Sequence, residues 1–244
     1  MLRADLGAAV MLLTRVPAGW LVGAAAVDPA RSVWAYPVVG AALGAGGAAV
    51  FALARWAGMT EALAAVWALV ALALLTGALH EDGLADLADG FGGGRNAARK
   101  LEIMRDSRVG SYGVLAVVLA TALRVAALAA LAGVGPAMIV AGALSRAGMG
   151  VPLLLLRPAR DGGLGASVGG RRGPALIGMA IAVGLAAFFL PAGAATAAVL
   201  SAAAASVGVA WLARAQIGGF TGDVLGGCAV VVECAVLSAL ACVP

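Results

Sequence analysis

The chain has 244 residues, of which 63% are apolar and only 11% are charged, and its mean hydropathy is +1.05. Soluble domains are about 45–50% apolar and about 25% charged, so this composition excludes a soluble enzyme and a disordered chain. The net charge of +4 comes from cations spread along the chain rather than gathered into a stripe, and we expect no nucleic-acid partner. Because a bilayer-spanning helix takes about 20 residues, the length predicts one all-α transmembrane domain over residues 1–244.

Apolar runs rich in Ala, Val, Leu and Gly predict a polytopic helical bundle of about seven transmembrane helices, with six to eight compatible with the pattern. Small residues suit such helices because they allow close approach between neighbours, as in the pattern that Gly40 and Gly44 form. The predicted spans are Val33–Ala54, Leu63–Leu79, Val114–Leu131, Pro136–Leu156, Pro174–Leu190, Thr196–Ala213 and Val224–Val243.

The cations predict the orientation of these spans. If the N-terminus lies inside, thirteen of the 16 Lys and Arg residues fall on the cytoplasmic side, and only Arg55 falls outside. Cytoplasmic segments of membrane proteins carry an excess of Lys and Arg. We therefore expect a multi-pass protein of the cytoplasmic (inner) membrane, embedded in the lipid bilayer, with its N-terminus and the segment after the second span inside.

That segment concentrates the acids, because six of the twelve Asp and Glu residues lie between Glu81 and Asp106. Asp82, Asp86 and Asp89 are spaced i, i+4 and i+7, which places them within about 60° of one helix face. Leu84, Leu87 and Phe91 fall on the opposite face. The pattern predicts an amphipathic acidic helix at the cytoplasmic side of the membrane.

Three stacked carboxylates repel one another, and no cation is interleaved at i±4 to offset the repulsion. One interpretation is an ordinary solvated acidic face. The stronger interpretation is a bound divalent cation, since carboxylate oxygens suit Mg²⁺, Mn²⁺ or Ca²⁺. Mg²⁺ in particular is held by one or two carboxylates together with substrate phosphates.

Glycines and cations follow the acids. Gly92–Gly94 is typical of a turn or a close approach of backbone to a ligand, and five cations lie between Arg95 and Arg108. Asp106 is a candidate fourth metal ligand or general base, and Arg105 and Arg108 could grip phosphate oxygens, besides marking the cytoplasmic side. Acids for a metal beside cations for anions indicate a phosphoryl-transfer site.

Three charged residues fall inside predicted spans, namely Arg124, Arg146 and Glu233. Such residues usually face the interior of a bundle or a polar cavity. For the two arginines, two interpretations stay open: pairing between helices, or contact with an anionic substrate from the membrane side.

Later polar segments are predicted to add groups at the same face. Asp161–Gly165 leads to Gly169 and Gly170 and then to Arg171 and Arg172, as either a phosphate-binding loop or a flexible basic loop. Asp223 opens the last span, either as a ligand or as a simple carboxylate of a first helical turn. We call Asp82, Asp86 and Asp89 the acid column. His80 lies on a different side of the same predicted helix and is expected to have a structural role.

Several motifs together resemble one known family, the cobalamin synthases or adenosylcobinamide-GDP ribazoletransferases. The most specific ones are His80-x-Asp82-Gly-Leu-Ala-Asp86-x-x-Asp89-Gly90 and Leu101-Glu-Ile-Met-Arg-Asp106-Ser-Arg108-x-Gly110-x-Tyr-Gly113. Shorter matches run through the chain in order: Leu13–Pro17, Ser145-Arg146, Gly163–Gly165, and Gly219-x-Thr221-Gly-Asp223-x-x-Gly226 with Glu233. Glu81 departs from the pattern, because an apolar residue is common there.

The resemblance implies an integral membrane enzyme that depends on Mg²⁺, joins α-ribazole or its 5′-phosphate to adenosylcobinamide-GDP, and releases GMP. The residues alone imply only a metal-dependent membrane transferase of phosphoryl groups with a cytoplasmic site. Asp82, Asp86 and Asp89 are expected to bind the metal, with Asp106 or Asp223 completing the cluster. Asp89 and Asp106 are the candidate bases, Arg105 and Arg108 are expected to neutralise phosphate charge, and the expected substrate-binding residues are Arg15, Arg146, Arg171, Arg172, Thr221 and Glu233.

Two rival functions remain open. A CDP-alcohol phosphotransferase would share the membrane, the metal and the displaced nucleoside monophosphate, but its D-x-x-D-G-x-x-A-R motif breaks here at Phe91–Gly94. A transporter would favour ionisable residues near mid-span and internal repeats. The sequence leaves open whether the chain forms a homo-oligomer.

Overall fold

The computed structural model describes residues 1–23, 28–160, 167–168 and 171–243. Regular structure in this part of the chain is helical, apart from one isolated bridge that pairs Pro158 with Phe220. The helices are α1 Leu2–Leu13, α2 Gly19–Val22, α3 Pro29–Ser32, α4 Tyr36–Trp56, α5 Glu61–Thr76, α6 Leu79–Gly93, α7 Ala97–Ile103, α8 Ser111–Ala130, α9 Val134–Gly148, α10 Gly150–Leu155, α12 Arg172–Phe189, α13 Ala192–Ile217 and α14 Gly222–Ala241, and a short 3₁₀ turn over Val33–Ala35 leads into α4.

Six of the helical segments are long and apolar enough to cross a bilayer, and a bent pair raises the count to seven. The six are Pro29–Trp56, Ser111–Ala130, Val134–Leu155, Arg172–Phe189, Ala192–Ile217 and Gly222–Ala241. The bent pair is α5 with α6, whose axes meet at 91°. These findings confirm the prediction of a polytopic helical membrane protein with about seven spans.

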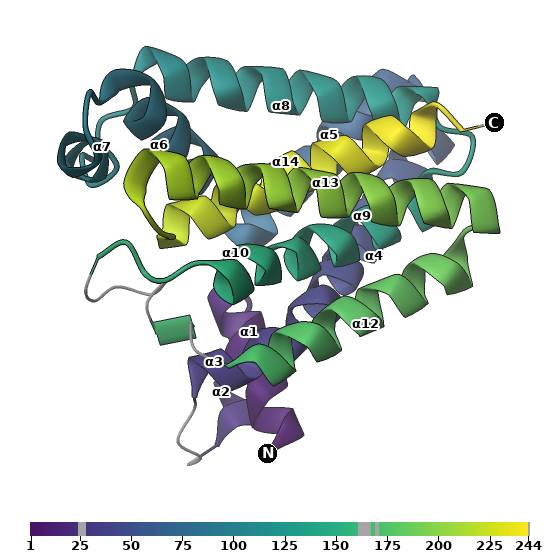
Figure 1. Cartoon of the computed structure of the whole chain (residues 1–244). Coiled ribbons are helices and arrows are strands. Elements are labelled where there is room, and N and C mark those ends of the chain that lie inside the picture. Colours follow the sequence, from purple (N-terminus) through teal and green to yellow (C-terminus); the bar gives the residue numbers. More distant parts are fainter. Residues whose placement is uncertain (24–27, 161–166, 169–170, 244) are drawn as a thin grey trace.

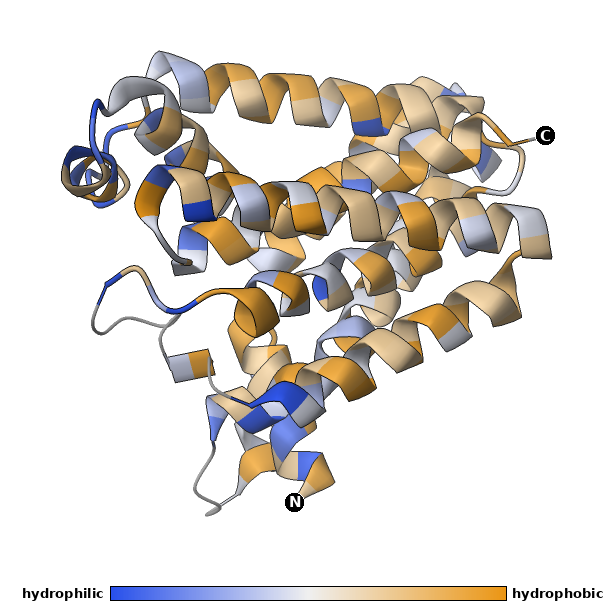
Figure 2. Ribbon diagram, in the orientation of Figure 1, coloured by the Kyte–Doolittle hydropathy of each residue, from blue (hydrophilic) through white to orange (hydrophobic). Residues whose placement is uncertain are grey.

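Two helices form the centre of the bundle. About 72% of the spanning window is buried both in α14 and in α9 with α10, against 22% in α12 and 28% in α8. Figure 1 shows α9 and α14 running between α8, α13 and α12, and Figure 2 shows apolar residues along these outer helices. The outer helices therefore present their apolar surface to lipid, where an exposed leucine needs no protein partner.

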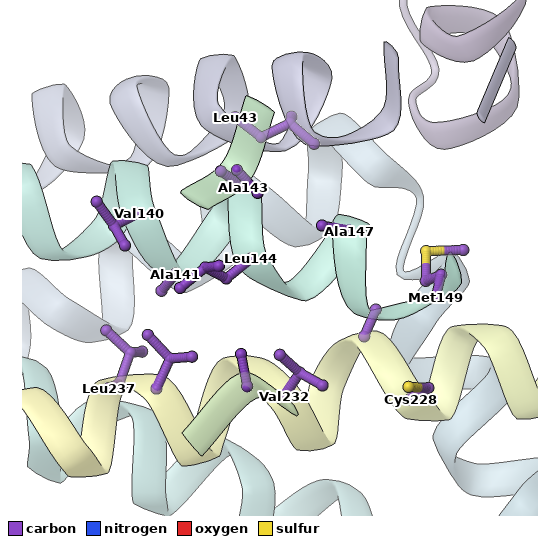
Figure 3. Packing of buried hydrophobic residues seen from close by; sticks show 14 of the residues in the cluster. Leu43, Val140, Ala141, Ala143, Leu144, Ala147, Met149, Cys228, Val232 and Leu237 are labelled. Atoms are coloured by element: carbon purple, nitrogen blue, oxygen red, sulfur yellow. The ribbon is translucent and has the colours of Figure 1, made fainter. Parts of the chain in front are cut away.

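Small side chains set the spacing at this centre. Figure 3 shows Ala141 and Leu144 on the side of α9 that faces Val232 and Leu237 of α14, with Met149 just beyond the end of α9. On the other face, α9 meets α4 so closely that a Cβ atom added to Gly142 would lie 2.2 Å from the carbonyl oxygen of Gly40. The Gly40–Gly44 pattern is thus a packing seam, as in transmembrane helices that associate through small residues.

The predicted second span is shorter than expected. It ends at Thr76 rather than Leu79, because Gly77 and Ala78 adopt left-handed backbone with φ of 68° and 56°. The chain then turns and continues as α6, which packs between α14 and α8 rather than standing apart as a rim helix. The turn aims the acidic helix at the start of α14.

The N-terminal helix closes this end of the bundle. Asp5 of α1 is 2% exposed and forms an ion pair of 2.8 Å with Arg31 of α3, just before α4. Arg15, directly after α1, donates its backbone N–H to the carbonyl oxygen of Leu75 at 2.7 Å. The end of α1 is therefore fixed beside the turn that precedes α6.

Candidate active site

A cavity of about 240 Å³ lies where the end of α1, the first turns of α6 and the start of α14 meet. Its polar lining groups are Tyr36, His80, Asp82, Arg160, Thr221 and Asp223. The remaining side chains that line it are apolar and come from the end of α1, Met149 after α9, Val168, the first turns of α6 and α14, and the segment that leads into α14. A concave, largely apolar site with a few convergent polar groups is the usual form of a small-molecule site.

The acidic helix supplies two carboxylates to this region. Asp82 is exposed and lines the cavity, and Asp86 is half-buried one turn further along α6. The negative charges of Asp82, Asp223 and Asp89 all act on the carboxyl group of Asp86, and only the charge of Arg160 opposes them. Leu84 and Leu87 are buried on the opposite face, which confirms the predicted amphipathic helix.

The start of α14 supplies the third carboxylate. Thr221 caps the helix by accepting the backbone N–H of Val224 at 3.2 Å, and its hydroxyl lies 3.1 Å from Oδ2 of Asp223. The same oxygen lies 3.5 Å from the guanidinium group of Arg160. The capping turn thus places Asp223 in the cavity, with a cation beside it.

Arg160 is held there by a short stretch of paired backbone. Ala159 donates its N–H to the carbonyl oxygen of Phe220 at 2.9 Å, and Phe220 donates to Arg157 at 3.0 Å. These bonds attach the segment after α10 to the segment before α14. Arg160 therefore reaches a carboxylate that lies 63 positions away in the sequence.

Asp89 is placed differently from the other acids of α6. It is 7% exposed, and its two carboxylate oxygens accept the backbone N–H groups of Gly110 at 2.7 Å and Gly113 at 2.9 Å, at the start of α8. A Cβ atom at either glycine would lie 2.4 Å from an Asp89 oxygen, so only glycine admits this contact. Asp89 acts as an N-terminal cap supplied by another helix, which favours a structural role over the predicted roles of ligand and base.

The predicted base Asp106 is also engaged. It forms a two-point ion pair with Arg108, at 3.0 Å and 2.7 Å, and accepts the backbone N–H of the same residue. The hydrogen bonds from Arg108 lower the pKa of Asp106 to about 2. A carboxyl group with so low a pKa is a weak base near neutral pH. Arg105 and Arg108 are exposed.

The charged residues of the spans form one buried network. Arg124 of α8 lies 2.9 Å from Glu81 of α6 and 3.5 Å from Glu233 of α14, and Arg146 of α9 lies 2.9 Å from Glu233. Two cations and two acids therefore balance one another across four helices. Of the two interpretations of the arginines, the structure favours pairing between helices, and it engages Arg146 and Glu233 with each other rather than placing them in the cavity.

The remaining predicted substrate-binding cations lie at the surface. Arg15 is exposed and packs against the Gly77 backbone, and Arg171 is exposed and pairs with Asp28 at 2.9 Å. Arg172 is exposed at the first turn of α12. The predicted loop Asp161–Gly165, with Gly169 and Gly170, lies outside the described residues.

Comparison with known proteins identifies the protein family. A family model described as cobalamin-5-phosphate synthase matches residues 5–241. The chain belongs to this family. It is 47% identical over 228 residues to the adenosylcobinamide-GDP ribazoletransferase of Bradyrhizobium diazoefficiens, covering 91% of this chain and 87% of that protein.

Other relatives carry the same name. The adenosylcobinamide-GDP ribazoletransferase of Azorhizobium caulinodans is 43% identical over 247 residues, covering 96% of this chain and 94% of the relative. That of Citrobacter koseri is 39% identical over 234 residues, covering 92% and 93%. No solved structure matches the chain. The resemblance seen in the motifs is confirmed across almost the whole length.

Three polar residues that line the cavity were not predicted as part of the site, namely Tyr36, His80 and Arg160. In the sequence, Arg160 is one of several cations predicted to lie on the cytoplasmic side. The only local sign of a role in the site was its position beside Asp161 and two glycines. His80 was expected to be structural, yet it lines the cavity and is 2% exposed, and both of its ring nitrogens lack a hydrogen-bond partner.

The cavity offers two carboxylates as candidate ligands of a divalent metal. Within the described ranges, no three His, Cys, Asp or Glu side chains converge closely enough to enclose a metal ion. Asp82 and Asp223 line one cavity, however, and both act electrostatically on Asp86. Two carboxylates together with substrate phosphates form the usual site of Mg²⁺, so these donors fit that ion once a phosphate is present.

Proposed function

We propose that the chain joins α-ribazole or α-ribazole 5′-phosphate to adenosylcobinamide-GDP and releases GMP. The product is adenosylcobalamin or its 5′-phosphate. The observation that carries this function is the cavity in which Asp82, Asp223 and Arg160 lie together, in a chain of this family. Carboxylates for a metal beside a guanidinium group for phosphate match the needs of phosphoryl transfer, which depends on positioning and on stabilising charge.

In this proposal a secondary hydroxyl of the ribazole ribose attacks the phosphorus on the cobinamide side of the pyrophosphate, because the 5′ position carries the phosphate in α-ribazole 5′-phosphate and keeps it in the product. A new oxygen–phosphorus bond forms there, the bond to GMP breaks, and GMP leaves with the bridging oxygen. The proton of the hydroxyl passes to one of the carboxylates at or beside the cavity, which are those of Asp82, Asp86 and Asp223. Arg160 balances phosphate charge from within the cavity, and Arg105 and Arg108 do so from the exposed loop after α7.

Asp82 and Asp223 would hold Mg²⁺ together with oxygens of the substrate phosphates, with the carboxyl group of Asp86 beside them. The ion would supply charge stabilisation to the pyrophosphate and to the departing GMP. The repulsion among the three carboxylates supports this assignment, because a divalent cation is the partner that relieves it.

We propose that the cavity faces the cytoplasm and that the N-terminus lies on the cytoplasmic side of the inner membrane. It opens at the end of the bundle that holds the cation-rich α7 and the first turn of α12, and Figure 2 shows hydrophilic residues gathered there. The excess of cations at this end supports the orientation through the positive-inside rule. Nucleotide substrates would then reach the site from the cytoplasm.

The experiment is a GMP-release assay with the purified full-length chain in liposomes. GMP should appear from adenosylcobinamide-GDP only when α-ribazole or its phosphate is added, and a corrinoid of the product's mass should appear in equal amount. Release of CMP from a CDP-alcohol instead would indicate a lipid phosphotransferase. The absence of release from either nucleotide, in a preparation that retains its helical circular dichroism spectrum, would overturn the proposed function.

A further inference from the structure

The cavity beside the acid column has more apolar wall than the chemistry at the phosphates requires. Leu12 and Leu13 of α1, Phe220 and Leu225 from the start of α14, and Met149 after α9 all contribute to its lining. Leu13 and Phe220 are each 1% exposed, so they belong to the core as well as to the cavity. Such a lining suits a planar or apolar group of a ligand rather than a pyrophosphate.

The charged lining groups lie close to one another. Arg160 and Asp223 are 3.5 Å apart, and the charge of Asp82 acts on Asp223. One ligand could therefore place an apolar group against the wall while a polar end reaches the carboxylates.

Three residues of the lining have buried polar atoms without hydrogen-bond partners. They are both ring nitrogens of His80, the hydroxyl of Tyr36 and one terminal nitrogen of Arg160. Burying a polar group without a partner destabilises a fold, so such groups usually mark a functional contact. In a cavity, hydroxyl groups of a ligand can supply the missing partners.

The size of the cavity restricts the ligand. Pockets that enclose a drug-sized molecule measure about 300–1,000 Å³. At about 240 Å³ this cavity can enclose a nucleoside base with its sugar, but not a corrinoid that carries GDP.

We propose that this cavity binds the nucleoside substrate, with its bicyclic aromatic base against the wall formed by α1 and the start of α14. His80 bonds the ribose, and the attacking ribose hydroxyl lies beside Asp82, Asp223 and Arg160. The larger corrinoid nucleotide approaches from outside and brings its pyrophosphate to the same charged groups. This inference rests on the proposed function, since it assigns one of the two substrates to a place.

The test fills the cavity from a residue that is only half-buried. Leu12→Trp adds bulk to the lining, and the neighbouring Met11→Trp is the matched control because Met11 is 43% exposed and does not line the cavity. The dissociation constant of α-ribazole is measured by titration calorimetry on the detergent-purified protein, and the KM for adenosylcobinamide-GDP is measured by GMP release.

We expect Leu12→Trp to weaken α-ribazole binding by about tenfold or more, since a single methylene in an apolar pocket changes discrimination by about 10–200-fold. The KM for adenosylcobinamide-GDP should stay within about twofold, and Met11→Trp should change neither constant. The variant should also shift its preference towards the nucleoside that lacks the methyl groups of the base.

His80→Leu is the second variant. It removes two unpartnered nitrogens without leaving a large void, so the fold should be as stable as before or more so, while α-ribazole binding weakens. A loss of stability without a change in α-ribazole binding would contradict the role of His80.

The outcomes separate this inference from the proposed function. Unchanged α-ribazole binding in Leu12→Trp, with a raised KM for adenosylcobinamide-GDP, would overturn the inference and assign the cavity to the other substrate. If the wild type releases GMP but Leu12→Trp binds α-ribazole as tightly as the wild type does, the proposed function stands and the proposed location of the nucleoside is refuted. Binding of α-ribazole without any GMP release would refute the function alone.

Discussion

Replacing Asp89 tests whether the third acid of α6 is a structural cap or a catalytic group. In Asp89→Asn, one oxygen can still accept a backbone N–H group, but the new amide nitrogen faces the second N–H group at the start of α8. One buried donor is then unpaired, which costs about 1–3 kcal/mol. The start of α8 also loses a negative charge that its dipole favours, worth about 0.3–1 kcal/mol.

Together these losses should lower the free energy of unfolding by about 1–4 kcal/mol. Gly113→Ala should act on the same contact from the other side, because its Cβ atom would lie 2.4 Å from Oδ2 of Asp89 and 2.9 Å from the carbonyl oxygen of Ala85. Overpacking of this kind costs about 1–3 kcal/mol.

The assay is unfolding of the full-length protein in mixed micelles of dodecylmaltoside and sodium dodecyl sulfate, followed by circular dichroism. Asp86→Asn is the matched control, since it removes an acid from the same helix face without removing a hydrogen bond to α8. At a temperature where all variants are folded, Asp89→Asn should keep turnover within about tenfold of the wild type. An unchanged unfolding midpoint together with abolished turnover would refute the capping role and restore Asp89 to the chemistry.

Three further predictions concern the rest of the scaffold. Arg124→Leu should cost about 3 kcal/mol by leaving the part-buried Glu81 without its partner, and Glu81→Leu/Arg124→Leu should recover most of it in a double-mutant cycle; additive losses would contradict the pairing. Gly142→Ala should lower stability by about 1–3 kcal/mol because its Cβ would lie 2.2 Å from the Gly40 oxygen, whereas Gly184→Ala, with open space around it, should be neutral in the same mixed-micelle unfolding assay. Because the pKa of Asp106 is lowered to about 2, this group stays ionised above that pH and should add no limb to the pH profile of kcat between pH 5 and 9. Asp106→Asn should leave the shape of that profile unchanged, and loss of its acidic limb would show that Asp106 titrates in the reaction.

Much of the fold follows from composition and periodicity. The apolar runs predicted the spans, and the i, i+4, i+7 spacing predicted an acidic helix whose apolar face is buried at Leu84 and Leu87. These features depend on local patterns that a single sequence contains. The early end of the second span also had a local cause, the left-handed backbone at Gly77 and Ala78.

The site could be predicted only in part, because its contacts join residues far apart in the chain. A sequence shows that Asp89 and Gly113 exist but not that α6 lies against the start of α8. In the same way, Arg124, Arg146 and Glu233 were recognised as unusual intramembrane charges, while their mutual pairing depends on how four helices pack. Arg160 was missed because its partner Asp223 is brought to it by backbone bonds to Phe220.

The structure also reduces the number of predicted acids that are available for a metal or a proton. Asp82 and Asp86 remain beside the cavity with Asp223, while Asp89 is committed to α8 and Asp106 to Arg108. Acids that share one helix face therefore need not share a role, because the neighbour opposite each residue decides what its oxygens bind.

The most direct test of the central claim is the rate of GMP release from adenosylcobinamide-GDP and α-ribazole as Mg²⁺ is titrated, for the wild type and for Asp82→Asn in liposomes. We expect wild-type release to require Mg²⁺ and to saturate with it. Asp82→Asn should keep its unfolding midpoint while its rate falls by at least about a hundredfold, as when a group that stabilises the transition state is removed. Near-wild-type release by Asp82→Asn at saturating Mg²⁺ would contradict the assignment of the reaction to this cavity.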